Sequence, residues 1–524
     1  MTQSTPRKGA AYFTLLLCIW SSFAQAQSDP EAIWNQLLKA NGKGVFPPEL
    51  VVKPLGNRGP AFYSQSTVYL EESLAAALDS AFGKQGESAL TYVLAHELAH
   101  HNCDHICSHF VRRGLKGTEA ERLSKEPEQR RIESVQDETE ADRLAGIYGH
   151  IAGFRPLDVA DSTLSLLYSL YDLPDSIPGY PTLEDRRTIA KNNRNQFDHV
   201  TLVYDMAWTT CALGLYDESA SLTRSIITEA KYKAPEIYEL FALANFLQAV
   251  DLIAKSYPRI STWGWPITLS HETNAKGISR SLAPDDWSQV ITRLKDAEQK
   301  AQEGLSIQSP ETQDEGLLKS IQFLIAWAQA PDSFLKQAAK QKASDDISSN
   351  HQALALWLSN PNKNQKKALQ ILSNNQHPTS SLNAELIRGQ YSTMRPVEHA
   401  ECDKLKVKQN TYNLMKSNMT KERVLLGKSL MFSLDKTDGG YDIQLGRSIH
   451  STRILIWTEP MTAPFCWGFE TGVTSRDEVF DAFADLPFRH LALQQGSFVS
   501  FPSERLTFQF GPDGTLSFIA WKSL

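Results

Sequence analysis

The chain has 524 residues, which is too long for one ordinary domain, so about two to four domains are expected. Hydrophobic residues make up 41% of the sequence and charged residues 22%, which is typical of a globular protein and argues against extensive disorder. The formal net charge of −7 excludes a generally basic nucleic-acid-binding protein, so we expect no nucleic-acid partner.

Residues 1–26 have the pattern of a secretory signal peptide. Arg7 and Lys8 form a short positive region, an apolar stretch follows over residues 10–23, and residues 24–26 (AQA) form a small-x-small cleavage site. The apolar stretch is short for a membrane span, which needs about 20 residues, so we expect cleavage; an uncleaved N-terminal anchor is the alternative. No later segment looks apolar enough to cross a membrane. We therefore expect an exported chain with no integral membrane segment after signal removal.

Cleavage would leave an odd number of cysteines, which excludes a small secreted scaffold held together by disulfides. One bridge is predicted, between Cys402 and Cys466, because both lie in the C-terminal region. Cys103 and Cys107 are four residues apart and could be mistaken for metal ligands. We interpret them as small apolar residues on a buried helical face.

The first domain is predicted to span residues 27–199. Its first expected elements are a short amphipathic helix at 31–40, loop and strand at 42–60, and a strand or hairpin at 61–70. Helical segments are expected from 71 to about 109, with a break near 83–86. A charged helix or loop at 111–137, a helix at 134–149 and a helical stretch at 156–173 are expected to follow.

Residues 200–395 form the next predicted region, which is helical nearly throughout. Residues 204–227 resemble one tetratricopeptide unit, but a 34-residue period does not recur, so we predict helical hairpins that serve as a scaffold or bind protein partners. Residues 396–524 are predicted to form a small β-rich domain. Its expected strands lie at 428–434, 441–445 and 452–458, and a β-hairpin is expected around Asp513-Gly514.

A five-residue motif, HELAH at 96–100, carries the clearest chemistry in the sequence. Residues four apart share one face of a helix, so His96 and His100 can both bind one ion. Zinc accepts two imidazoles and a carboxylate and leaves a fourth position for water. Glu97 is then placed to act as a general base. Because a chance HExxH occurs in roughly one chain in fifty, a third ligand is needed to support this prediction.

The third ligand is predicted to be Glu138. A histidine six residues after His100 is absent, because Ile106 stands there, and His101 and His105 are interpreted as surface residues or as supports for the ligands. Glu138 and Asp142 lie one helical turn apart, so Glu138 can bind the ion while Asp142 accepts a hydrogen bond from a ligand imidazole. A solvated acidic helix end is the alternative interpretation.

HELAH followed by ETEADRLAG resembles the M48 metallopeptidase family, in which HExxH is followed on a later helix by ExxxD. The likeness covers about residues 45–195 and includes a small-Gly-aromatic-x-Pro turn at 152–156. It implies one zinc ion per chain, held by His96, His100 and Glu138, with Glu97 as base and Asp142 supporting a ligand. It also implies polypeptide substrates.

Residues 181–186 (PTLEDR) resemble a further segment of that family, HP-x(4)-R. The resemblance implies an active-site or structural role for Arg186, although a surface arginine is the alternative. The family histidine before this proline is replaced here by Tyr180. A tyrosine hydroxyl could support the transition state by donating to an oxyanion, but it could equally serve only in packing.

Together these features predict a multidomain α+β protein: a mainly helical, zincin-like metallopeptidase domain with a small edge sheet, a helical-hairpin region and a β-rich C-terminal domain. The predicted function is zinc-dependent endopeptidase activity on unfolded or misassembled exported proteins, in the periplasm rather than fully secreted. The strand at 61–70 would bind an extended substrate, and the segment at 111–137 could act as a lid. The rival hypotheses are a periplasmic chaperone with a latent or gated site, and a helical scaffold with accidental motifs.

Overall fold

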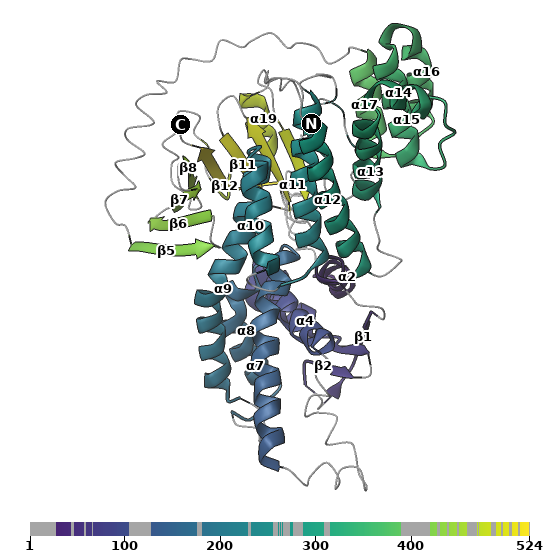
Figure 1. Cartoon of the computed structure of the whole chain (residues 1–524). Coiled ribbons are helices and arrows are strands. Elements are labelled where there is room, and N and C mark those ends of the chain that lie inside the picture. Colours follow the sequence, from purple (N-terminus) through teal and green to yellow (C-terminus); the bar gives the residue numbers. More distant parts are fainter. Residues whose placement is uncertain are drawn as a thin grey trace, which may run out of the picture. The chain divides into compact units, whose positions relative to one another are not determined.

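The computed structural model describes residues 28–42, 47–56, 59–64, 66–103, 127–175, 181–228, 232–254, 260, 263, 265, 273–275, 287–308, 315–388, 420–426, 430–437, 440–447, 450–457, 469, 471–483, 489–493, 496–501, 506–511 and 514–522. These form two compact units. The first takes the described parts of Met1–Asn35, Pro48–Ala145 and Arg155–Ala190, and the second those of Gln36–Pro47, Gly146–Phe154 and Lys191–Leu524. Mostly helical segments and small sheets agree with the predicted α+β class (Figure 1). The predicted domain boundaries stay predictions.

A three-stranded sheet lies in the first unit, in the order β1-β3-β2. β1 (Glu49–Lys53) runs parallel to β3 (Thr67–Glu71), and β2 (Ala61–Ser64) runs antiparallel to β3. The β2–β3 pair confirms the hairpin predicted at 61–70. β2 is an edge strand of this sheet, so one side of its backbone is not paired with another strand of the sheet.

The helix that carries the HELAH motif is the core of the first unit. α3 (Leu74–Phe82) ends at Gly83, whose φ of +57° suits a residue without a Cβ, and a short 3-10 turn (Gly83–Gln85) leads into α4 (Gly86–Asn102). This confirms the predicted break near 83–86. Every residue of α4 from Ala89 to His100 is buried, as expected for a helix that is covered on all sides.

Residues of three helices are divided between the two units: α2 (Pro30–Asn41), α7 (Pro127–Ile151) and α9 (Leu183–Ala212). α8 (Pro156–Leu170) belongs to the first unit, begins with proline at its first turn and packs against α4. Cys103 follows α4 as a half-buried residue. Cys107, Cys402 and Cys466 lie outside the described residues, so the predicted bridge stays a prediction.

Eight helices follow α9 in the described part of residues 213–388: α10 (Tyr216–Thr228), α11 (Pro235–Ala254), α12 (Trp287–Ser306), α13 (Gly316–Gln329), α14 (Pro331–Ala338), α15 (Asp346–Ser359), α16 (Pro361–Ser373) and α17 (Pro378–Arg388). Sequential helices pack on each other, as helical hairpins do. A tetratricopeptide arrangement stays a prediction.

α11 is long and apolar enough, by length and composition, to cross a membrane. This departs from the expectation that no later segment has that character. However, 67% of its apolar window is buried inside the protein, which is typical of the core helix of a soluble protein. Composition alone therefore does not assign α11 to a membrane.

The second unit also holds a nine-stranded sheet, in the order β4-β9-β10-β11-β12-β8-β7-β6-β5 among the described strands. Most come from the C-terminal part: β5 (Thr420–Leu426), β6 (Leu430–Thr437), β7 (Gly440–Arg447), β8 (His450–Trp457), β9 (Arg489–Leu493), β10 (Gly496–Phe501), β11 (Leu506–Phe510) and β12 (Leu516–Lys522). The predicted strands and the terminal hairpin are confirmed. β4 (Thr273–Ala275) joins from within the helical region.

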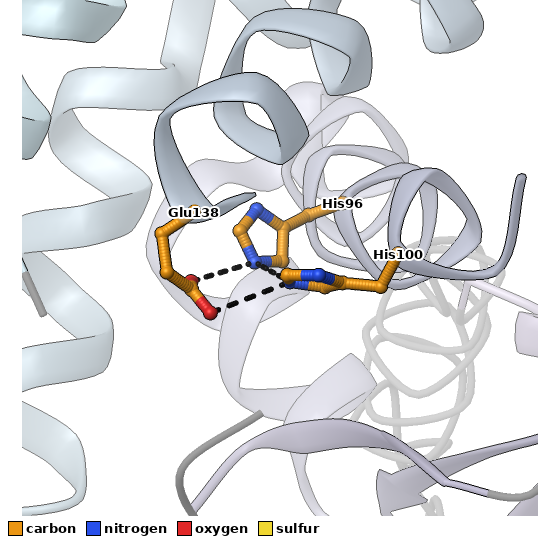
Figure 2. A group of neighbouring side chains, drawn as sticks. All are labelled: His96, His100 and Glu138. Atoms are coloured by element: carbon orange, nitrogen blue, oxygen red, sulfur yellow. Dashed lines mark hydrogen bonds and ion pairs between the residues drawn. The ribbon is translucent and has the colours of Figure 1, made fainter. Parts of the chain in front are cut away.

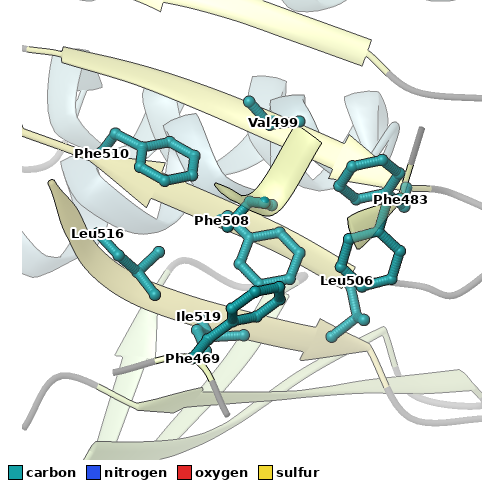
Figure 3. Close-up of a cluster of buried hydrophobic side chains, with 10 residues drawn as sticks. Phe469, Phe483, Val499, Leu506, Phe508, Phe510, Leu516 and Ile519 are labelled. Atoms are coloured by element: carbon teal, nitrogen blue, oxygen red, sulfur yellow. The ribbon is translucent and has the colours of Figure 1, made fainter. Parts of the chain in front are cut away.

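Aromatic side chains form the hydrophobic core against this sheet (Figure 3). Phe508 lies at its centre and contacts Phe469, Phe483 and Phe501 at ring-centroid distances of 5.6–5.9 Å. α19 (Arg476–Ala482) contributes Val479, and a capping box between Ser475 and Glu478 begins this helix. Burial of these large rings gives the sheet a core of its own.

A buried histidine, His351 on α15, makes the stability of the second unit depend on pH. Its ring stacks on Phe323 and its Nε2 lies 3.1 Å from the hydroxyl of Ser320. Burial lowers the pKa of His351 from 6.5 to about 3, so the folded chain holds it neutral while the unfolded chain binds a proton below pH 6.5. Stability therefore falls as the pH drops through this window.

We expect acidification from pH 7 to pH 5 to cost the wild type about 2 kcal/mol through this residue, and His351→Leu to remove that cost. Urea midpoints at both pH values, followed by circular dichroism, measure the difference. Loss of the Ser320 contact changes the stability equally at both pH values. Only the change in stability between pH 7 and pH 5, the slope, is therefore diagnostic. An unchanged slope in His351→Leu contradicts the prediction.

Candidate metal centre

His96 and His100 lie one turn apart on α4 and face the same point (Figure 2). Their Nε2 atoms are 3.1 Å apart, and their rings meet edge to face with centroids 4.7 Å apart. Both side chains are buried. The spacing predicted from the motif therefore gives two converging imidazole nitrogens.

Glu138 on α7 completes the cluster from the neighbouring helix. Its Oε2 lies 3.3 Å from His96 Nε2, and its Oε1 lies 3.5 Å from His100 Nε2. The three residues each offer one ligand atom, and these atoms lie within 4.8 Å of one another. Among the residues that the structure describes, this is the one such group with metal-ligand potential.

These residues fit a zinc ion. Ligands arranged tetrahedrally around zinc at about 2.0–2.1 Å lie about 3.3–3.4 Å from one another. The observed separations of 3.1–3.5 Å match this spacing. Glu138 Oε2 is also buried without a hydrogen-bond donor, which a positive ion would compensate. Two nitrogens and one carboxylate form a donor set that is typical of catalytic zinc and leaves a position open.

Asp142, one turn after Glu138, supports His96 from behind. Its Oδ1 lies 2.9 Å from His96 Nδ1, a close contact between carboxylate and imidazole. Arg186 donates two hydrogen bonds to Asp142, of 2.6 and 2.9 Å, and the hydroxyl of Tyr92 donates a third, of 3.0 Å. Asp142 is thereby fixed in place and charged, and can hold the His96 ring in one orientation.

The charges in the cluster attract a cation. Burial by itself lowers the pKa of His96, but contacts with Asp142 and Glu138 outweigh it and raise this pKa to about 10. Burial by itself raises the pKa of Glu138, but His96 and His100 lower it to about 2. The carboxylate is thus ionised at neutral pH. A protonated imidazole or a divalent ion would each supply the positive charge that this site favours.

Glu97 lies beside the cluster on α4. It is buried, its Oε2 has no hydrogen-bond partner, and the backbone amide of Tyr63 on β2 is close enough to lower the pKa of its carboxyl group, against the larger effect of burial. Burial raises the pKa of Glu97 from 4.5 to about 7. A carboxyl group that exchanges its proton near neutral pH has the property required of a general base.

The structure brings together five of the predicted residues, His96, His100, Glu138, Asp142 and Arg186, and Glu97 lies next to them. Arg186 is half-buried, with a side chain 12% exposed, and is paired with Asp142, which disagrees with the alternative of a solvated surface arginine. Tyr180 and His105 lie outside the described residues, so the role suggested for Tyr180 stays a prediction.

Two tyrosines were not predicted as parts of this site. Tyr92 stands one helical turn before His96, a spacing that places it on the ligand face and could have suggested its role. Tyr63 lies 33 residues before His96, the first residue of the motif, and its contacts with α4 depend on the packing of strand against helix.

Asp142→Asn is expected to weaken zinc binding by about 10–100-fold, because the neutral amide holds the His96 ring less firmly. Competition with a chromophoric chelator measures the affinity. Asp161→Asn is the matched control: it removes an Asp–Arg pair with Arg187 that is partly exposed, and should leave zinc affinity unchanged. Equal affinities in wild type and Asp142→Asn would contradict the supporting role.

Comparison with known families agrees with this geometry. Residues 22–161 match a family described as "Putative neutral zinc metallopeptidase". The match covers about a quarter of the chain, includes His96, His100, Glu138 and Asp142, and ends before Arg186. No curated protein matches the chain. The part of the chain that carries the cluster is thus similar to zinc peptidases.

Proposed function

We propose that the chain is a zinc-dependent endopeptidase with His96, His100 and Glu138 as ligands and Glu97 as general base. The main support is the buried cluster of two histidines and one glutamate, whose atoms have the spacing of zinc ligands. The buried carboxyl group of Glu97 lies beside it, on the helix that carries both histidines. The family match over residues 22–161 supports the same reaction class. The order of HExxH on α4 and Glu138 with Asp142 on α7 supports an M48-like arrangement.

When bound, zinc supplies Lewis-acid chemistry: it lowers the pKa of water and polarises a carbonyl group. Glu97 accepts the proton of the attacking water at its free Oε2 and delivers it to the leaving amine. Asp142, held by Arg186 and Tyr92, keeps the His96 ring in the orientation that presents Nε2 to the cluster.

The free edge of β2 supports binding of an extended polypeptide. Glu71 N–H donates a hydrogen bond to the Pro60 carbonyl group. Along an antiparallel strand, every second residue directs its backbone N–H and C=O toward the partner strand. The residues between them, Ala61 and Tyr63, therefore direct their backbone groups away from β3. The effect of the Tyr63 backbone amide on the Glu97 carboxylate agrees with this direction and supports a free edge that faces the base. We propose that substrate pairs along this edge by strand addition.

A second candidate function, a chaperone or assembly factor with a gated site, is favoured by burial of the centre. His100 and Glu138 are only 3% and 2% exposed, which agrees with a centre that a polypeptide reaches after a movement of the chain. The helical segments α10–α17 would then bind protein partners or substrates. The charged segment at 111–137, of which residues 111–126 lie outside the described chain, is proposed as the lid.

We also propose that residues 1–26 direct export to the periplasm and are removed, which N-terminal sequencing of the mature chain would test. Zinc content and casein hydrolysis of the purified mature chain test the enzyme itself. One zinc per chain with turnover supports the peptidase, and zinc without turnover supports the gated site. A chain without zinc overturns both proposals.

A further inference from the structure

Tyr63 joins the edge strand to the active-site helix at two points. Its hydroxyl lies 3.0 Å from Nδ1 of His101, and its backbone amide is close enough to the carboxylate of Glu97 to affect the charge on that group. Glu97 and His101 are four residues apart, so both contacts fall on one face of α4. The Tyr63 and His101 rings also meet edge to face, with centroids 5.5 Å apart.

This double contact sets where the free edge of β2 lies. The strand has only four residues and is paired by β3 on one side. On its other side, backbone groups of Ala61 and Tyr63 point to the region of Glu97. A short edge strand has backbone hydrogen bonds to only one partner strand, and a shift of β2 would move these groups relative to the base.

We propose that His101 is a positioning residue, which acts through the Tyr63 hydroxyl to hold β2 at a fixed place beside Glu97. This inference rests on the proposed function, because it assigns the held edge to substrate. The proposal gives a role to His101, which follows the ligand His100 in the sequence but does not belong to the ligand cluster. Tyr63 and His101 are both half-buried, and the strand and helix that carry them, β2 and α4, are in contact.

The expected phenotype separates binding from chemistry. His101→Ala and Tyr63→Phe should each raise KM for casein about 5- to 10-fold. This corresponds to the loss of about 1–1.5 kcal/mol of binding free energy, as expected for one hydrogen bond. The value of kcat should change less than about 2-fold. His101→Asn should restore most of the loss, because its side-chain amide occupies the place of Nδ1. Tyr69→Phe on β3 is the matched control and should leave KM unchanged.

A double-mutant cycle tests whether the two residues act as one pair. His101→Ala combined with Tyr63→Phe should be no worse than either change alone, because the same contact is lost. Hydrogen exchange of residues 61–71, compared between wild type and His101→Ala, should show faster exchange of the β2–β3 hairpin at unchanged zinc content. Additive effects in the cycle, or equal exchange rates, overturn the proposal.

Hydrogen exchange and a binding measurement test the proposal without turnover. Binding of fluorescein-labelled, reduced casein can be measured by anisotropy in a Glu97→Gln background that does not hydrolyse it. If the otherwise unchanged chain binds zinc but never cleaves casein, the peptidase proposal fails while exchange and binding still decide the role of His101. If casein is cleaved but the cycle is additive, the role of His101 fails and the peptidase proposal stands.

Discussion

Glu97→Gln is expected to lower casein hydrolysis by about 10²–10⁴-fold, the range typical for loss of a general base. The amide has the size of the carboxylate but cannot accept the proton from water. Because Glu97 is not one of the three ligands in the cluster, zinc should remain at one ion per chain. Initial rates on casein and zinc content by atomic emission measure both quantities on the same preparation.

Glu87→Gln is the matched control, since it makes the same change at an exposed position in the first turn of the same helix. It should leave hydrolysis and zinc content unchanged. Full activity in Glu97→Gln would contradict its role as base. Loss of zinc together with activity would instead show that Glu97 holds the metal site together.

Glu138→Gln is expected to remove zinc from the chain, so that metal content after gel filtration falls well below one ion and hydrolysis is lost with it. A neutral amide is a weak zinc ligand, and two imidazoles alone do not complete the donor set. Zinc at about 100 times its Kd should stabilise the wild type by about 2.7 kcal/mol, and this stabilisation should be absent in the variant. Thermal unfolding with and without added zinc measures the difference.

Glu140→Gln, two residues further along α7, is the control, because its side chain is 48% exposed and lies outside the cluster. It should bind zinc like the wild type. Removal of zinc from the wild type with a chelator should reproduce the loss of activity, and added zinc should restore it. Equal zinc content in Glu138→Gln and wild type would contradict the assignment of Glu138 as ligand and shift it to a supporting role.

The sequence alone determined the local parts of this site. His96, Glu97 and His100 follow from five adjacent letters, because a helix places residues four apart on one face. Glu138 and Asp142 follow from the same spacing, with a resemblance to a family pattern that selects them from many acidic neighbours. The hairpin of β2 and β3 and the strands of the C-terminal region follow from alternation and turn residues.

Only the tertiary structure decided which of these parts meet. Arg186 and Tyr92 converge on Asp142 from segments 44 and 50 residues away, and Tyr63 reaches both Glu97 and His101 from the edge strand. β4 joins a sheet whose neighbouring strand β9 lies more than 200 residues later. Local periodicity fixes which residues share a face of one helix. The meeting of distant segments depends on how buried surfaces pack, which spacing along the chain does not encode.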